Sequence, residues 1–210
     1  MSTKEDVLEI IRSERIMAIV RLADQQDVAP VVAALVHGGM PLLEITTNTP
    51  GFATEIEKAR TKHNAVVIGA GTVTNVALAE KSIGAGAQFL VSPNVNRALG
   101  EYALSKNVPL LMGAMTPTEV NDALLFGADI IKLFPAVPLG IPYFKALKGP
   151  FGGCPFYAVG GVDLNNITDW FQAGAVGVGL GGSLIGAAPY SEKKMAQLSQ
   201  RTTEFMGTLS

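Results

Sequence analysis

The sequence predicts a single α/β domain folded as a (β/α)8 barrel, also known as a TIM barrel. Eight short apolar runs recur along the chain, and amphipathic segments separate them. The 210 residues are close to the lower limit for eight strand–helix units, so they leave no room for a second domain. We therefore expect residues 1–210 to form one barrel, with an N-terminal capping helix and a C-terminal helix added to it.

The apolar runs have the length and the residue types of strands that are buried on both faces, as in a parallel sheet. In chain order they are IMAIVR (16–21), PLLEIT (41–46), AVVIGAGT (65–72), QFLVSP (88–93), VPLLMG (108–113), DIIKLFP (129–135), PFYAVGG (155–161) and AVGVGLGG (175–182).

The segments between the runs have helical periodicity and end in Gly, which is a common helix terminator. Clear examples are residues 27–39, 75–87 and 116–128. A further helix is expected at about residues 3–14, before the first strand, and another after Ser191. This alternation of strands and helices is typical of a (β/α)8 barrel.

Composition excludes several classes of partner. The formal net charge is -2, with 16% charged residues, so no basic surface is expected for nucleic acid or an anionic membrane. The N-terminal segment has no apolar stretch typical of a secretory signal, and no apolar run is long enough to span a membrane. One cysteine, Cys154, cannot form an intrachain disulfide. These features predict a cytoplasmic protein.

Lys132 is the most unusual residue, because an ammonium group lies within an apolar strand. Burying an unpaired charge is costly, and it lowers the pKa of a lysine. Strand alternation places Lys132 on the same face as Ile130 and Phe134, and it places Glu44 on the same face as Leu42. If both faces point into the barrel, the lysine and the glutamate converge there.

Two interpretations of this pair are open. A structural ion pair is one, since such pairs also perturb pKa values. A catalytic site is the other, and it is favoured because both residues come late in their strands, where barrel active sites lie. A lysine that loses its proton is a nucleophile that condenses with a ketone. Glu44, whose pKa burial would raise, could then transfer protons.

Two glycine clusters, VGGV and LGGS, follow the last two strands. Exposed backbone N–H groups at such positions bind phosphate in many barrels, so a phosphorylated small molecule is expected. GAGT (69–72) lacks the spacing of a dinucleotide-binding loop. His37 and His63 fall in helices, and no cluster has the spacing of metal ligands, so neither a metal nor a cofactor is predicted.

The motifs LLEIT, IGAGTV, FLVSPN, IKLFPA, VGGV and GLGGS, in this order, resemble the class I aldolases that cleave 2-keto-3-deoxy-6-phosphogluconate (KDPG) and 4-hydroxy-2-oxoglutarate (KHG). The resemblance runs from about residue 15 to 188. It implies cleavage of KDPG to pyruvate and glyceraldehyde 3-phosphate, cleavage of KHG as well, and a homotrimer.

The resemblance also implies roles for individual residues. Lys132 would form the Schiff base and Glu44 would be the general acid and base. The pyruvate moiety would contact Thr72, Pro93 and Phe134. The phosphate group would be bound through backbone amides and a hydroxyl by Gly160, Gly161, Gly181, Gly182 and Ser183.

Two positions depart from the family pattern. Many members have an arginine that binds the substrate carboxylate four residues after the glutamate, where this chain has Asn48. A carboxylate needs a cation, and Arg21 at the end of the first strand is the substitute we expect. Val159 replaces a threonine that is usual in KDPG-specific members, and valine resembles the branch that acts on the galactonate epimer, KDPGal. Preference for the epimer therefore stays open.

Two other functions also stay open. A phosphosugar isomerase on the same barrel would use the glycine loops but would not need a buried lysine. A non-catalytic barrel that binds a sugar phosphate would tolerate Lys132→Arg.

Overall fold

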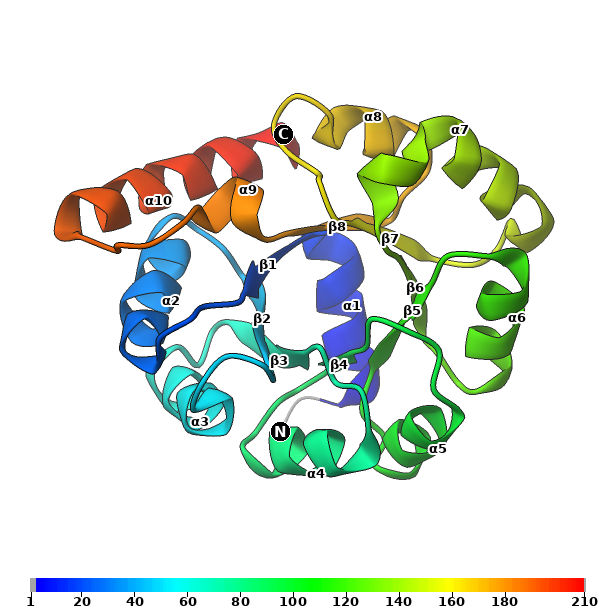
Figure 1. The fold of residues 1–210 in the computed structure, drawn as a ribbon, viewed down its shortest axis with the longest axis horizontal. Helices are drawn as coiled ribbons and strands as arrows, with labels where there is room; N and C mark the ends of the chain where they lie inside the picture. The colour runs from blue at the N-terminus through cyan, green and yellow to red at the C-terminus, as the bar shows by residue number, and fades with distance from the viewer. Residues whose placement is uncertain (1–2, 210) are drawn as a thin grey trace.

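The computed structural model describes residues 3–209 and is a closed barrel of eight parallel strands (Figure 1). Each strand pairs with its neighbours in chain order, and β8 pairs with β1 to close the sheet. The predicted fold class is thus confirmed. The strands are β1 (Ile16–Val20), β2 (Leu42–Thr46), β3 (Val67–Gly71), β4 (Leu90–Val91), β5 (Leu110–Ala114), β6 (Ile130–Leu133), β7 (Phe156–Val159) and β8 (Gly177–Leu180).

Helices surround the barrel on the outside (Figure 1). They are α2 (Val28–His37), α3 (Phe52–Lys62), α4 (Val76–Gly84), α5 (Arg97–Ser105), α6 (Pro117–Leu125), α7 (Ala136–Lys148), α8 (Ile167–Gln172), the short α9 (Gly182–Ile185) and α10 (Glu192–Met206). Single 3-10 turns occur at Gln25–Asp27, Gly149–Phe151 and Gly207–Leu209.

All eight predicted strands are present, but each is shorter than its apolar run. Arg21, Thr72, Pro93 and Phe134 lie just beyond the ends of their strands, in the loops that lead to the next helices. The backbone turns away from the sheet there, so these side chains are placed by loops and not by strand alternation.

The first helix, α1 (Lys4–Glu14), lies behind the centre of the barrel in Figure 1. Its apolar side chains Val7, Leu8 and Ile11 belong to the same buried cluster as the inward-facing residues of the strands. The Tyr157 hydroxyl, inside the barrel, donates a hydrogen bond to the Ile11 carbonyl. The helix therefore covers the end of the barrel that is opposite the functional rim.

The last helix, α10, packs beside α2 and joins the end of the chain to the barrel wall (Figure 1). Gly38 permits this contact, because a Cβ there would lie only 2.4 Å from the Ser199 carbonyl oxygen. Arg201 donates a hydrogen bond to the Leu184 carbonyl, which ties α10 to α9. Within residues 3–209, every helix is too short or too polar to cross a membrane.

Candidate active site

Lys132 and Glu44 both point into the barrel, as strand alternation predicts. Leu42 and Ile130, two residues earlier on the same faces, belong to the buried cluster in the interior. Glu44 is 1% exposed and Lys132 is 4% exposed. Two ionisable groups are therefore held in an apolar environment at the rim end of the barrel.

Burial changes the ionisation of both groups in the direction that favours their neutral forms. The pKa of Lys132 is lowered, mainly by desolvation and further by the charge of Arg21, while Glu44 opposes this shift. The pKa of Glu44 is raised by desolvation, against the opposing influence of Lys132 and Arg21. The site thus combines an amine that loses its proton readily with a carboxyl group that holds one.

The lysine and the glutamate do not form a direct ion pair. Neither is part of any salt bridge within residues 3–209, and neither Glu44 oxygen has a hydrogen-bond partner there. The Lys132 amino group instead lies 5.3 Å from the centre of the Phe134 ring. Of the two interpretations of this pair, a direct structural ion pair therefore does not explain the burial of the two groups.

Arg21 follows β1 and reaches the same cavity. One of its terminal nitrogens donates a hydrogen bond of 3.1 Å to the Thr72 hydroxyl. Thr72 has a φ of 58°, a left-handed conformation that is rare for a β-branched residue and is found mainly at functional sites. Asn48, in contrast, is exposed on the loop after β2.

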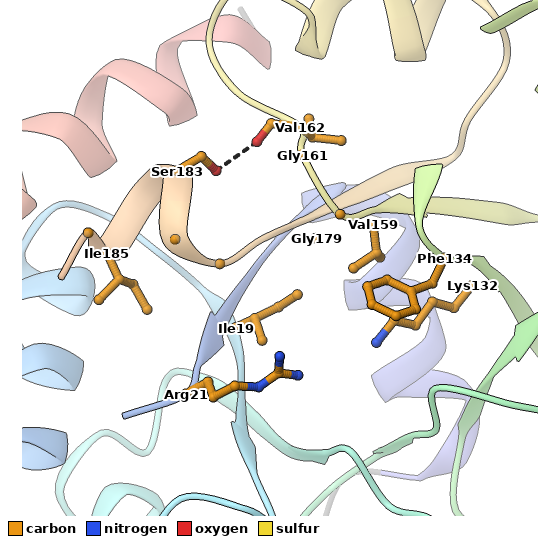
Figure 2. Close-up of a pocket in the computed structure, with 14 residues that line it drawn as sticks. Ile19, Arg21, Lys132, Phe134, Val159, Gly161, Val162, Gly179, Ser183 and Ile185 are labelled. Atoms are coloured by element: carbon orange, nitrogen blue, oxygen red, sulfur yellow. Dashed lines mark hydrogen bonds between the residues drawn. The ribbon is translucent and has the colours of Figure 1, made fainter. Parts of the chain in front are cut away.

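A cavity of about 490 Å³ opens at the rim of the barrel. In Figure 2, Arg21 and Lys132 extend into it from opposite sides, and the Phe134 ring lies beside Lys132. Nine of the predicted site residues line it: Arg21, Lys132, Phe134, Val159, Gly160, Gly161, Gly181, Gly182 and Ser183.

Three predicted site residues, Glu44, Thr72 and Pro93, do not line this cavity. Thr72 is connected to it by the hydrogen bond from Arg21. Glu44 makes no such contact, and it and Lys132 only influence each other's pKa. Pro93 lies against β5, because a Cβ on Gly113 in that strand would be 2.2 Å from the Pro93 carbonyl carbon. Gly113 pairs with Lys132, so Pro93 is near the lysine but on the far side of β5.

The two glycine loops line the part of the cavity that lies away from Arg21 and Lys132, as Gly161 and Ser183 show in Figure 2. Gly160 and Gly161 have φ angles of 99° and 87°, which residues with a side chain rarely adopt. The backbone N–H groups of Gly161, Gly182 and Ser183 donate no hydrogen bond to any group within residues 3–209. Unpaired N–H groups of this kind are suited to bind an anion.

The Ser183 hydroxyl already has a hydrogen-bond partner within the chain. It donates a hydrogen bond of 2.7 Å to the Val162 carbonyl, shown as the dashed line in Figure 2. A hydroxyl has only one proton to donate, so this oxygen cannot donate to a phosphate group while the bond is present. Within the site, Ser183 therefore offers its backbone N–H group.

Gly71 and Thr47 are site residues that sequence reasoning missed. A Cβ on Gly71 would lie 2.2 Å from a Glu44 carboxylate oxygen, so only glycine leaves space for this side chain. The Thr47 hydroxyl donates a hydrogen bond to the Thr72 carbonyl. A signal for Gly71 was available, because it is the second glycine of GAGT and its strand follows the one that carries Glu44. No sequence pattern indicated Thr47.

Comparisons with known proteins agree with this geometry. Residues 7–200 match the family described as KDPG and KHG aldolase. The chain is 33% identical over 210 residues to a 2-dehydro-3-deoxy-phosphogluconate aldolase of Treponema pallidum, covering 97% of this chain and 99% of the relative. It is 36% identical over 171 residues to a probable 2-dehydro-3-deoxy-6-phosphogalactonate aldolase of Rhizobium meliloti, covering 80% and 81% of the two chains.

Among solved structures, the KDPG aldolase of Legionella pneumophila superposes with a TM-score of 0.82 at 26% identity. The match covers 96% of each chain, and that crystal contains pyruvate captured as a covalent carbinolamine intermediate. A match over nearly the whole length, in sequence and in structure, shows that this chain belongs to the KDPG and KHG aldolase family.

Proposed function

We propose that the protein is a Schiff-base aldolase that reversibly cleaves KDPG to pyruvate and glyceraldehyde 3-phosphate, and that it also cleaves KHG. The observation that carries the proposal is Lys132, a fully enclosed lysine with a lowered pKa that faces a cavity and has no ion-pair partner within the described residues. Family membership supports the same chemistry.

The reaction follows from the two ionisable groups. The neutral Lys132 amine adds to the C2 ketone, and loss of water from the carbinolamine gives a protonated imine. Glu44 accepts the proton of the C4 hydroxyl while the C3–C4 bond breaks, and the bonding electrons move toward the imine nitrogen. The aldehyde leaves, the resulting enamine takes up a proton at C3, and water releases pyruvate and restores the lysine. Because its pKa is raised, Glu44 binds a proton more readily than an ordinary carboxylate, so it can accept the C4 hydroxyl proton and return a proton to C3.

The ends of the substrate would be bound on opposite sides of the cavity. Arg21 and Thr72 would hold the carboxylate next to the ketone, since a guanidinium group forms strong hydrogen bonds to carboxylates. Phe134 and Pro93 would pack near the pyruvate carbons. The phosphate would contact the N–H groups of the two glycine loops: Gly160, Gly161, Gly181, Gly182 and Ser183.

Val159 lines the cavity and is 6% exposed, and it would contact the C4 hydroxyl, whose configuration distinguishes the two epimers. A valine cannot hydrogen-bond the C4 hydroxyl, so discrimination between KDPG and its galactonate epimer should be weak. We give KDPG precedence and keep KDPGal as the alternative, because relatives with either name are similar to this chain.

The test is to incubate the purified protein with KDPG and, separately, with KDPGal, and to measure released pyruvate with lactate dehydrogenase and NADH. We expect pyruvate from both epimers, with KDPG cleaved at least as efficiently. A higher kcat/KM for KDPGal would assign the alternative substrate. Binding of either sugar acid without pyruvate release would instead favour the isomerase or the sugar-phosphate-binding protein.

Gly71 provides a further prediction for this mechanism. Gly71→Ala should push the Glu44 carboxylate away from its position, because the added methyl group would overlap it. Displacement of a catalytic group by about 1 Å can cost about 10²-fold in rate, so we expect kcat to fall by about that factor. Borohydride trapping of pyruvate on Lys132 should continue, because the three atoms nearest the added methyl group all belong to Glu44. A variant with unchanged kcat would show that the position of Glu44 is not critical.

We also propose a homotrimer, on the basis of the family resemblance, and a cytoplasmic location, on the basis of the composition and the single cysteine. The trimer predicts a mass in solution about three times the 22.0 kDa of one chain, measured by light scattering after size-exclusion chromatography. A monomeric mass would contradict this part of the proposal.

A further inference from the structure

The end of β2 and the loop after it, residues 46–49, contact the backbone on either side of Arg21 and the backbone of Thr72. On one side this segment holds the backbone that carries Arg21. The Thr46 hydroxyl donates to the Val20 carbonyl at 3.3 Å, and the Leu22 N–H donates to the Thr49 hydroxyl at 3.2 Å. Thr46 and Thr49 are both buried, and their hydroxyls lie 3.1 Å apart. The residues on either side of Arg21 are therefore anchored by the same loop.

On the other side, the loop holds Thr72. The Thr47 hydroxyl donates a hydrogen bond of 2.6 Å to the Thr72 carbonyl, and the Thr47 N–H donates to the Gly71 carbonyl at 2.8 Å. These bonds fix the two peptide groups that precede and follow the Thr72 Cα atom. A β-branched residue with a φ of 58° needs such support, because this conformation is unfavourable by itself.

The direction of the Thr72 side chain depends on this backbone conformation. Its hydroxyl accepts the hydrogen bond from Arg21, so its own proton is available for donation to an anion. If the Thr72 backbone relaxed to the ordinary β region, its side chain would turn away from Arg21. The hydrogen bond between Thr72 and Arg21, which lines the cavity, would then be lost.

We propose that Thr47 is a positioning residue for carboxylate recognition, which acts by holding Thr72 in the conformation that pairs with Arg21. The inference rests on the proposed function, because it assumes that the pair binds the carboxylate of a 2-keto acid. It predicts that Thr47 affects affinity for the charged end of the substrate and leaves the chemistry at Lys132 unchanged.

The test compares Thr47→Val, which keeps the shape but lacks the hydroxyl, with Thr47→Ser, which keeps the hydroxyl. The measurement is the ketone concentration that gives half-maximal borohydride trapping on Lys132. For pyruvate, we expect this concentration to rise about threefold to tenfold in the valine variant and to stay within about twofold of wild type in the serine variant, as expected for loss of one hydrogen bond. Trapping at saturation should be unchanged.

Methyl pyruvate is the matched control ligand, because it has the same ketone but no carboxylate charge. Half-maximal trapping of methyl pyruvate should occur at the same concentration in all three proteins. An equal rise for both ketones in Thr47→Val would overturn the proposal, since it would show a general disturbance of the site. An unchanged value for pyruvate would overturn it as well. If the valine variant does not fold, Thr47→Ala replaces it in the same comparison.

A double-mutant cycle tests whether Thr47 acts through Thr72. In a Thr72→Ala background, adding Thr47→Val should cause no further rise in the half-maximal pyruvate concentration. A further rise of the full threefold to tenfold would overturn the proposed route. Wild-type protein that forms no pyruvate adduct would contradict the proposed function itself, and with it this inference. Normal wild-type trapping with an unaffected valine variant would contradict the inference alone.

Discussion

Replacing Lys132 with Ala should lower the rate of KDPG cleavage by several orders of magnitude. Without the amine no imine forms, so the electrons of the C3–C4 bond have no acceptor. The substitution should not prevent folding, because it removes a buried group that has no ion-pair partner within residues 3–209. The measurement is kcat from pyruvate release, together with the affinity for glyceraldehyde 3-phosphate.

The glycine loops, and not Lys132, form the proposed phosphate site, so the affinity of the Lys132→Ala protein for glyceraldehyde 3-phosphate should be nearly unchanged. Lys132→Arg is the matched control, because arginine keeps a positive charge but stays protonated and forms no imine. This variant should be as inactive as the alanine variant. Activity of either variant within tenfold of wild type would rule out the imine mechanism.

Replacing Glu44 with Gln should slow cleavage by about 10²–10⁴-fold, the usual contribution of a general acid–base group. Glutamine has nearly the same shape and fits the space next to Gly71, but it cannot exchange a proton. The loss should therefore appear in kcat and in the exchange of the pyruvate methyl protons with deuterium from D2O. Imine formation itself should persist, because Lys132 remains.

Proton exchange and trapping together show whether a slow Glu44→Gln variant has lost proton transfer or imine formation. Slow exchange with normal trapping would assign proton transfer to Glu44. A reduction of exchange by less than tenfold would mean that a group other than Glu44 moves the protons.

The sequence predicted the order and type of the elements because each strand is a separate apolar run and each helix is amphipathic. The strand ends were less certain. QFLVSP (88–93) predicts a six-residue strand, whereas β4 contains only Leu90 and Val91. Neighbouring strands decide where a ladder ends, and this information is not local in the sequence.

The part of the site that could be predicted from the sequence is the part that depends on strand alternation and on the position of the rim. Lys132 and Glu44 share the interior for that reason, and Arg21 reaches the same cavity from the end of β1. The hydrogen bonds of Ser183 to Val162 and of Thr47 to Thr72 could not be predicted, because they join loops that are distant in the sequence. Their geometry depends on how the whole barrel closes.

Direct detection of the covalent adduct tests the central claim that Lys132 is buried so that it can act as a neutral nucleophile. The protein is incubated with pyruvate and sodium borohydride, its intact mass is measured, and the modified peptide is mapped. The account predicts one pyruvate-sized adduct per chain, located on Lys132. A folded protein that acquires no adduct, or that acquires it on another lysine, would contradict the account.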